Sequence, residues 1–128
     1  MQDFEIKSKT NNAIREFFFQ RYPTLFEGID PFNFDLPVGW MYLVYNLCEH
    51  IKDFPLKIKQ VKQKMGSLRV YVDTEKLTPE LQAEVWAFCT DAEKESHHIC
   101  EMCGTQGNVV KTDSHFIQSL CENCRKLK

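Results

Sequence analysis

The sequence has no long apolar run, because Lys, Arg, Asp or Glu interrupts every hydrophobic stretch. A membrane-spanning helix needs about 20 consecutive apolar residues, so we expect a protein that does not enter the membrane. Its first residues, Met-Gln-Asp-Phe-Glu, lack the basic and apolar segments of a secretion signal. No low-complexity tract is present that would predict disorder. The sequence therefore predicts a folded cytosolic protein.

Sequence signatures of common enzyme sites are also missing. The chain contains no Gly-rich phosphate loop, no nucleophile elbow and no His-Glu-x-x-His pattern. Glu49 and His50 could form an acid–base pair, but adjacent residues on a helix do not face each other. We therefore expect a non-enzymatic protein.

Hydrophobic residues, by contrast, are plentiful. They make up 43% of the 128 residues and include ten Phe and two Trp, which is ample for a buried core. The length fits one domain with a small appendage. We expect an α+β fold with helices packed on a small antiparallel sheet. Residues 1–98 would form this core domain, and residues 99–128 a zinc ribbon docked on it.

Capping residues and a proline predict the first helix. It covers about residues 11–22, with Thr10 or Asn11 as its cap and Pro23 as its stop. An irregular, aromatic-rich connection follows. Three phenylalanines of this connection are expected to fill the core: Phe26, Phe32 and Phe34.

Apolar periodicity predicts a second and a third helix. The second begins near Pro37, with Asp35 as its cap and Pro55 closing it. Five residues form its apolar face: Trp40, Leu43, Val44, Leu47 and Ile51. The third opens at Thr78-Pro79-Glu80 and leads directly into the C-terminal cysteines. Its opposite face is acidic, with Glu84, Asp91 and Glu95.

The stretch between these two helices predicts a β-hairpin. Leu68, Val70 and Val72 alternate with polar or amphipathic residues, as in a half-buried strand. A similar alternation from Leu56 slips by one residue at Val61, which indicates a β-bulge. Met65-Gly66 lies between the two runs and suits the turn.

This hairpin concentrates positive charge in a chain whose net charge is −2. Residues 56–72 carry five bases and no acid, whereas residues 73–101 carry two bases and eight acids. Any anion binding must therefore be local. Cations beside an aromatic ring suit phosphate and base recognition, which makes four residues candidate ligand contacts: Lys62, Lys64, Arg69 and Tyr71. The alternative, which we favour for Lys57 and Lys59, is that lysines guard an exposed strand against aggregation.

Four of the six cysteines form two matching Cys-x-x-Cys knuckles. Cys100 and Cys103 make the first, and Cys121 and Cys124 make the second, with seventeen residues between them. In a reducing compartment this pattern indicates metal rather than disulfides. Four thiolates favour one tetrahedral Zn²⁺ with no open position; an iron site is the alternative, ranked well below zinc. Gly104 can supply a positive φ at the first turn.

The surroundings of the knuckles yield further predictions. Val109-Val110 and Phe116-Ile117 suit a short hairpin that brings the two knuckles together. Backbone N–H groups and three basic side chains could donate to the thiolates: Lys111, Arg125 and Lys126. Three histidines flank the site, in outer-shell or exposed positions: His97, His98 and His115. The remaining cysteines, Cys48 and Cys89, lie in apolar helical patterns and are expected to be buried.

Zinc knuckles also frame a class of nucleases. Those enzymes need a general-base His beside a strand and a second His or Asn for a catalytic metal. Here Asp113-Ser114-His115 and Asn108 have the wrong order and spacing. We rank the zinc-knuckle nuclease third among the functional hypotheses.

Several segments resemble a family of small uncharacterised phage and bacterial proteins. They are Gly39-Trp40, residues 60–71, Ala92-Glu93 with Ser96, residues 100–104, and Leu120-Cys121 with Cys124. The shared hairpin pattern is Val-Lys-x-Lys-x-Gly-x-Leu-Arg-x-Tyr, and the resemblance covers about residues 38–124. Gln63, Met65 and Val70 depart from the Glu, Phe and Phe usual there. The resemblance implies a phage or prophage accessory protein that binds a host component or signal.

Two binding hypotheses therefore lead. The first is an anionic ligand, either a nucleotide or nucleic acid, bound through the basic hairpin. The second is a protein-interaction module that inhibits a host defence or regulatory protein. Its contact surface would be the acidic third helix or the N-terminal aromatic loop.

Overall fold

The structure is a computed structural model that describes residues 10–113 and 115–127. Within this part the chain forms four α-helices and two antiparallel strand pairs, which confirms the predicted α+β class. No helix in these two ranges is long and apolar enough to cross a membrane. The first five residues, interpreted above as lacking a secretion signal, and Ser114 of the nuclease hypothesis lie outside the described residues.

The elements follow one another as helices, a long hairpin, a long helix and a small metal-binding unit. The helices are α1 (Asn11–Arg21), α2 (Met41–Ile51), α3 (Pro79–Ser96) and α4 (Glu122–Lys126). The strands are β1 (Lys57–Lys64), β2 (Ser67–Asp73), β3 (Val110–Lys111) and β4 (Ser119–Leu120). Two short 3₁₀ turns, η1 (Pro31–Asn33) and η2 (Val38–Trp40), precede α2.

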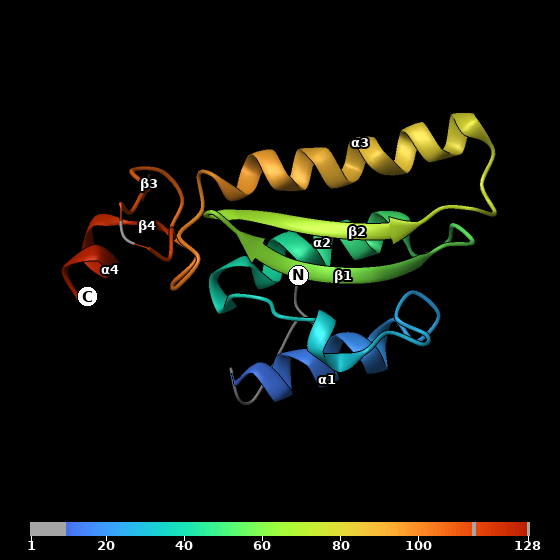
Figure 1. Ribbon diagram of the computed structural model, residues 1–128, viewed down its shortest axis with the longest axis horizontal. Coiled ribbons are helices and arrows are strands. Elements are labelled where there is room, and N and C mark those ends of the chain that lie inside the picture. Colours follow the sequence, from blue (N-terminus) through green and yellow to red (C-terminus); the bar gives the residue numbers. More distant parts are fainter. Residues whose placement is uncertain (1–9, 114, 128) are drawn as a thin grey trace.

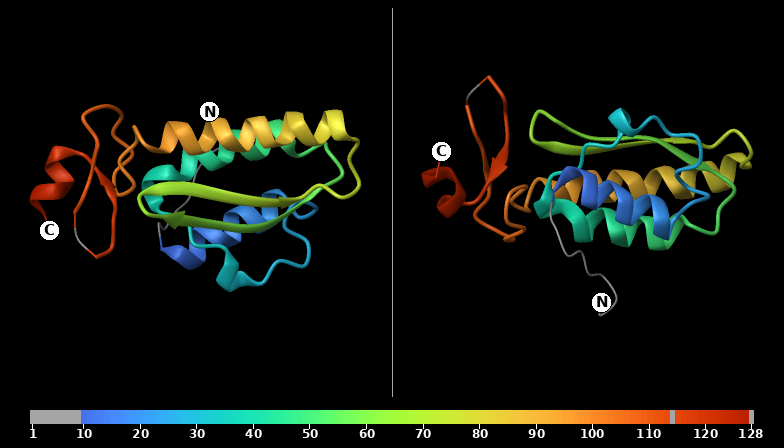
Figure 2. Two further views of the ribbon diagram at one scale, coloured as in Figure 1. Left: turned by 45° about the horizontal axis from the view of Figure 1, so that its top comes forward. Right: turned by 90° about the horizontal axis from the view of Figure 1, so that it is seen from below.

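Helices α1, α2 and α3 lie on one side of the β1–β2 hairpin, as the right-hand view of Figure 2 shows. Helix α3 runs alongside β2 (Figure 1), and Phe34 bridges to Val61 at the free edge of β1. The largest fully buried side chains between these layers are Trp40, Phe18, Phe34 and Ile14. The β3–β4 unit and α4 lie at the turn end of the large hairpin (Figure 1).

Helix α1 begins where its capping residue predicts. The Thr10 hydroxyl accepts a hydrogen bond from Ala13 N at 3.2 Å, which satisfies one of the free N–H groups of the first turn. In the connection that follows, Phe26 and Phe34 are buried as predicted, but Phe32 is 92% exposed. The reason is η1: Asp30 accepts from Phe32 N at 3.0 Å, and this tight turn leaves the Phe32 ring in solvent.

Helix α2 buries its predicted apolar face, including Trp40 and Val44 at 0% exposure. The prediction that Asp35 caps this helix is wrong. Asp35 N donates to Val61 O at 2.9 Å, so the residue extends the edge of β1 instead. A 3₁₀ turn then leads into α2, which ends at Ile51, four residues before Pro55.

The hairpin turn and the bulge are confirmed. Met65 and Gly66 have φ of 54° and 81°, the left-handed pair that a two-residue type I′ turn requires. The register shifts between Ile58 and Gln60. Beyond this bulge Lys62 lies opposite Arg69.

Helix α3 is capped by Thr78, whose hydroxyl accepts from Leu81 N at 3.3 Å. Val85 and Ala92 are buried in the core, and the buried Ser96 hydroxyl accepts from Leu68 N at 2.9 Å. This last bond fixes the end of α3 against the start of β2. The predicted acidic residues Glu84, Asp91 and Glu95 are exposed.

Candidate metal centre and basic hairpin face

The structure brings the four predicted cysteines together. Their sulfur atoms all lie within 4.8 Å of one another, and the sulfurs of Cys103 and Cys121 are 3.7 Å apart. A tetrahedral zinc site with Zn–S bonds of about 2.3 Å has sulfur–sulfur edges of about 3.8 Å. The cluster therefore has the size of a four-thiolate site and is consistent with zinc.

Local backbone geometry aims these sulfurs at one point. Gly104 N donates to Cys100 O at 2.8 Å, and Gly104 has the predicted positive φ, at 83°. In the second knuckle Arg125 N donates to Cys121 O at 3.0 Å, at the start of α4. Each Cys-x-x-Cys segment thus closes a tight turn that places its two thiols side by side.

The four thiols differ in their surroundings. Cys100, Cys121 and Cys124 are buried, whereas Cys103 is exposed. Hydrogen bonds from the Thr105 side chain and backbone lower the pKa of Cys103 to about 6, and the two side-chain atoms lie 3.0 Å apart. Burial raises the pKa of Cys124 to about 12. Thr105 is a site residue that the sequence reasoning missed, and its position two residues after Cys103 is its only signal.

The basic residues predicted to donate to the thiolates have other described partners. Lys111 Nζ contacts Ser119 Oγ at 2.8 Å and His97 Nδ1 at 2.6 Å. Arg125 donates to Leu120 O at 2.9 Å, and Lys126 pairs with Glu122. These side chains therefore hold the framework around the cysteines.

The small hairpin between the knuckles pairs differently from the prediction. Val110 lies opposite Leu120 and Lys111 opposite Ser119, so Phe116 and Ile117 precede the second strand instead of forming it. The reason is burial: Ser119 and Leu120 are fully buried, whereas Phe116 is 60% exposed.

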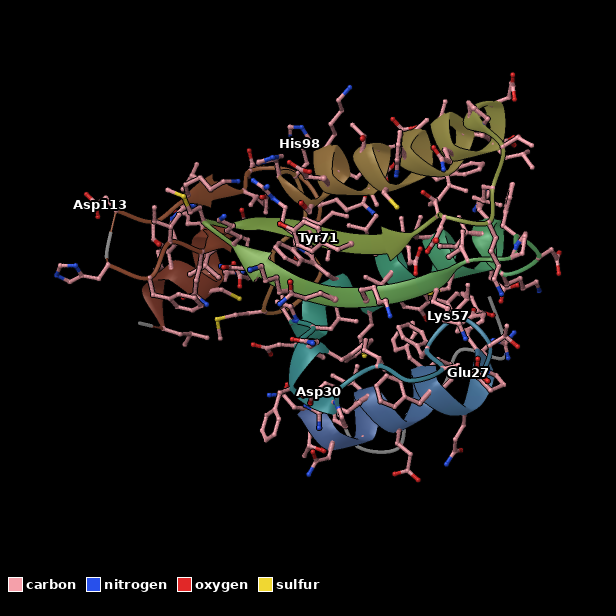
Figure 3. The ribbon with its side chains drawn as sticks, turned by 45° about the vertical axis from the view of Figure 1, so that its right-hand side comes forward. Glu27, Asp30, Lys57, Tyr71, His98 and Asp113 are labelled. Carbon is pink, nitrogen blue, oxygen red and sulfur yellow. The ribbon has the colours of Figure 1, made fainter. Side chains whose placement is uncertain are left out.

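The remaining histidines and Cys48 lie as predicted, whereas Cys89, which was predicted to be buried, is only partly buried. His98 and His115 are exposed, and Figure 3 shows His98 and Asp113 at separate surface positions. Burial and the neighbouring Lys111 lower the pKa of His97, which favours a neutral ring. Cys48 is fully buried, and burial raises its pKa well above the ordinary value. Burial also raises the pKa of Cys89, to about 11.

The C-terminal segment from residue 99, which carries the four cysteines and is here called the cysteine unit, packs closely against the core. Gly39 N donates to Glu101 O at 2.8 Å, and the Trp40 indole donates to Ile99 O at 2.9 Å. A Cβ at position 39 would lie 2.1 Å from Cys100 O. At the hairpin turn the Ser119 hydroxyl donates to Gly66 O at 2.5 Å. These contacts cross the predicted boundary at residue 98 and couple the knuckles to the turn.

The four candidate ligand contacts share the face of the hairpin opposite the helices. Lys62 and Arg69 are cross-strand partners, and the Lys62 ammonium lies 5.9 Å from the centroid of the Tyr71 ring. Tyr71 is 41% exposed and Lys64 is also exposed. We define Lys62, Lys64, Arg69 and Tyr71 as the basic hairpin face.

A groove of about 200 Å³ borders this face, where β2 meets α3. Tyr71 and the half-exposed Trp86 both line it. The Arg69 guanidinium lies in the same groove, with its Nε 3.7 Å from the Glu93 carboxylate. Trp86 is a second residue that the sequence reasoning missed; a Trp outside the apolar stripe of a predicted helix was the available signal.

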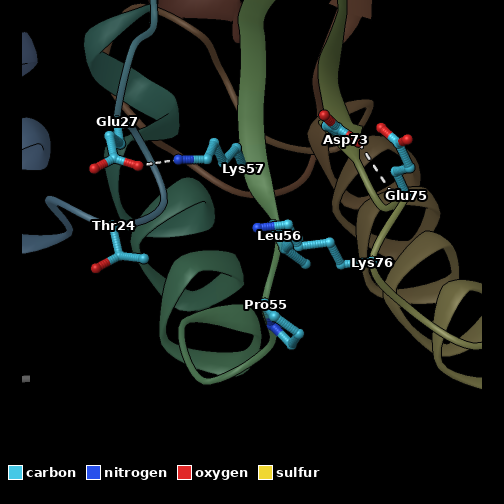
Figure 4. A pocket seen from close by; sticks show the side chains of 8 residues that line it. All are labelled: Thr24, Glu27, Pro55, Leu56, Lys57, Asp73, Glu75 and Lys76. Carbon is cyan, nitrogen blue, oxygen red and sulfur yellow. Dashed lines mark hydrogen bonds and ion pairs between the residues drawn. The ribbon is translucent and has the colours of Figure 1, made fainter.

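Lys57 is placed differently from the basic hairpin face. It forms an ion pair with Glu27 at the opposite end of the hairpin, beside a cavity of about 260 Å³ that Thr24, Leu56 and Asp73 also line (Figure 4). The Lys57 hydrogen bond lowers the pKa of Glu27. Lys57 thus joins the aromatic connection to the sheet; its predicted role in guarding an exposed strand stays a prediction.

Comparison with known proteins identifies no relative: no family model, no curated protein and no solved structure matches this chain. The resemblance to phage and bacterial proteins therefore stays a prediction.

Proposed function

We propose that this chain is a zinc-stabilised binding protein that holds a nucleotide or nucleic acid on its basic hairpin face. One structural Zn²⁺ would occupy the cysteine cluster. Four thiolates complete its shell and leave no position for substrate or activated water. The metal would substitute for a hydrophobic core that some thirty residues cannot build.

The observation that carries the ligand proposal is the grouping of cations and exposed rings. Lys62, Lys64 and Arg69 supply positive charge on one face of two short strands, and Tyr71 lies among them. Phosphate groups are bound by such cations, and nucleobases stack on aromatic rings. The groove between Tyr71 and Trp86 offers a place for a base next to cations that would hold its phosphate.

A protein partner is the second candidate, and the exposure of Phe32 favours it. A phenylalanine at 92% exposure is the kind of aromatic anchor that interfaces bury. It lies on the N-terminal aromatic loop that the sequence analysis named as a contact surface. A phage accessory protein that inhibits a host defence protein would fit this surface.

Nucleotide binding is tested by a thermal-shift and calorimetry panel. Mono-, di- and cyclic nucleotides and short oligonucleotides are titrated into the zinc-loaded protein. We expect binding that weakens steeply with added salt, because cation–phosphate contacts release counterions. Arg69→Ala should cost about 1–3 kcal/mol of binding free energy. Tyr71→Ala should weaken the binding of nucleotides more than the binding of inorganic phosphate, because stacking needs a base.

Lys59→Ala is the matched control. Lys59 is an exposed lysine of β1 that lies outside the basic hairpin face. Lys59→Ala changes the net charge by the same amount as Lys62→Ala. Lys62→Ala should weaken binding clearly more than Lys59→Ala. If none of the probes binds the wild type, the nucleotide proposal is wrong. Capture of a host protein that is lost in Phe32→Ser would then support the second candidate.

A further inference from the structure

Another pocket, whose charged lining residues are acids and not bases, lies where the cysteine unit meets the core. Its volume is about 280 Å³. Pro37, Val38, Met102 and Phe116 provide apolar walls, and Asp35, Gln63, Glu101 and Gln118 provide the polar atoms. Gln63 is opposite Leu68 in the hairpin register, so it lies on the inner face, away from Lys62 and Lys64. The pocket is therefore separate from the basic hairpin face.

The glutamine side chains leave two buried acceptors without partners. Gln63 Nε2 donates to Ile117 O at 2.6 Å and to Glu101 at 3.0 Å, which fixes the orientation of the amide. Its Oε1 atom is buried and has no hydrogen-bond partner among the described residues, and the same holds for Gln118 Oε1. Gln118 is only 9% exposed. Buried polar atoms nearly always have a partner, so these two carbonyl oxygens indicate a donor that is still to be supplied.

Glu101 adds a buried negative charge. Its side chain is 3% exposed, and Oε1 accepts from Ser119 N at 2.8 Å. Among the described residues, no Lys, Arg or His nitrogen lies within ion-pair distance of this carboxylate. Lys111 interacts electrostatically with this carboxylate, although its ammonium contacts His97 and Ser119 and forms no ion pair with Glu101. A buried carboxylate that lacks a direct ion-pair partner favours a cation placed against it.

The apolar walls and the polar atoms together define the ligand. The two buried side-chain atoms without described partners, Gln63 Oε1 and Gln118 Oε1, are both acceptors, and Asp35 adds a second carboxylate at the exposed rim. Only two carboxylates line it, and the described residues contain no second group of three or more His, Cys, Asp or Glu able to hold a metal. A guanidinium offers five donors and an ammonium three, and either can carry an aliphatic stem against Val38, Met102 and Phe116.

We propose that this pocket binds a guanidinium or ammonium group on an aliphatic stem. Glu101 supplies the counter-charge, and the free oxygens of Gln63 and Gln118 accept the N–H groups. The stem packs on Met102 and Phe116. The source of the group is an Arg or Lys side chain of a partner protein or a free polyamine. The inference stands independently of nucleotide binding.

The test uses zinc-loaded full-length protein and two probes of equal shape, butylguanidinium and its neutral analogue butylurea. Binding is followed by the NMR signal of the ¹³C-labelled Met102 methyl group. We expect butylguanidinium to shift this signal saturably and to bind at least about tenfold tighter than butylurea. Two further probes separate the two sources of the cationic group. N-acetyl-arginine amide should bind tighter than spermidine if the natural ligand is a protein side chain. Spermidine should bind tighter if the natural ligand is a polyamine.

Variants assign the binding to the pocket. Gln118→Leu removes one acceptor without leaving a cavity, and Asp35→Asn removes charge at an exposed position where folding is not at risk. Each variant should weaken the binding of butylguanidinium at least about fivefold, whereas Lys59→Ala should leave that binding unchanged. Equal binding of the two probes, no Met102 shift at about 10 mM butylguanidinium, or unchanged binding in Asp35→Asn would overturn the proposal. Displacement of the probe by Ca²⁺ at lower concentration would instead indicate a metal site and overturn it too.

Discussion

Position 39 has no room for a side chain. An added Cβ would meet Cys100 O at 2.1 Å and Glu101 C at 2.6 Å, both backbone atoms that cannot turn away. We predict that Gly39→Ala lowers the free energy of unfolding by about 3 kcal/mol, measured by urea denaturation of the zinc-loaded protein.

Gly107→Ala is the matched control for this prediction. Gly107 has φ of 81° but nothing within 4 Å of the added Cβ, so only backbone strain of about 1 kcal/mol is expected. A loss at position 39 no larger than that at position 107 would show that the close approach does not hold the knuckle.

Single residues also show where sequence reasoning succeeds and where it stops. The metal ligands could be predicted because two Cys-x-x-Cys turns have a chemical meaning that spacing alone carries. Phe32 and Phe34 could not be told apart, because they lie in one loop and only the η1 turn decides which ring is buried. Thr105 and Trp86 were missed because their roles depend on neighbours that the fold supplies.

At the scale of elements, a polar cluster joins α1 to α2. The Tyr22 hydroxyl donates to Glu49 at 2.5 Å, and this hydrogen bond is the largest of the effects that lower the pKa of Glu49. A carboxyl group whose pKa falls on folding stabilises the protein above its unfolded pKa of about 4.3. This stabilisation is lost as the pH falls through the lower pKa of the folded state.

We therefore predict that Tyr22→Phe lowers the free energy of unfolding by about 1 kcal/mol at pH 7. The variant should also lose less stability than the wild type on acidification from pH 7 to about pH 3, measured by urea midpoints. Tyr71→Phe, which removes a hydroxyl outside this cluster, should follow the wild-type pH dependence. A Tyr22→Phe curve parallel to the wild-type curve would contradict the assignment.

The second prediction for an element concerns the cysteine unit, whose own core is small. Cys100, Leu120, Cys121 and Cys124 are its buried cluster, so removal of the metal should unfold residues 99–128 while the helices of the core persist. Trp40 can report this, because its indole donates to Ile99 O. In a Trp86→Phe background, a strong chelator should shift Trp40 fluorescence to longer wavelength with little loss of helical circular dichroism.

Added zinc should reverse the change. Loss of all helical signal together with the Trp40 shift would mean that the core cannot fold without the metal. An unchanged Trp40 spectrum after complete metal removal would mean that the unit is held by packing alone.

The elements themselves were largely predictable, because apolar periodicity and caps are local. Thr10, Thr78 and the Met65-Gly66 turn lie where the sequence indicated. The errors are non-local. Asp35 pairs with the edge of β1 and does not cap α2. The second strand of the small hairpin is set by burial of Leu120 among the cysteines and of Ser119 at the turn of the large hairpin.

For the whole molecule, we predict the absence of turnover on nucleic acid. Supercoiled DNA and RNA incubated with Mg²⁺ or Mn²⁺ should stay intact on gels, because no second group of metal-ligating side chains lies in the described part of the chain. Cleavage that disappears in His115→Ala would contradict the non-enzymatic proposal and restore the nuclease hypothesis.

The central claim is that one zinc ion holds the four cysteines, and metal content of the purified protein tests it most directly. Elemental analysis should find about one zinc per chain and no stoichiometric iron. Cys103→Ser should lose most of this zinc, although Cys103 is exposed, whereas Cys48→Ser should keep it. A folded wild-type protein that contains no zinc, or iron in its place, would contradict the account.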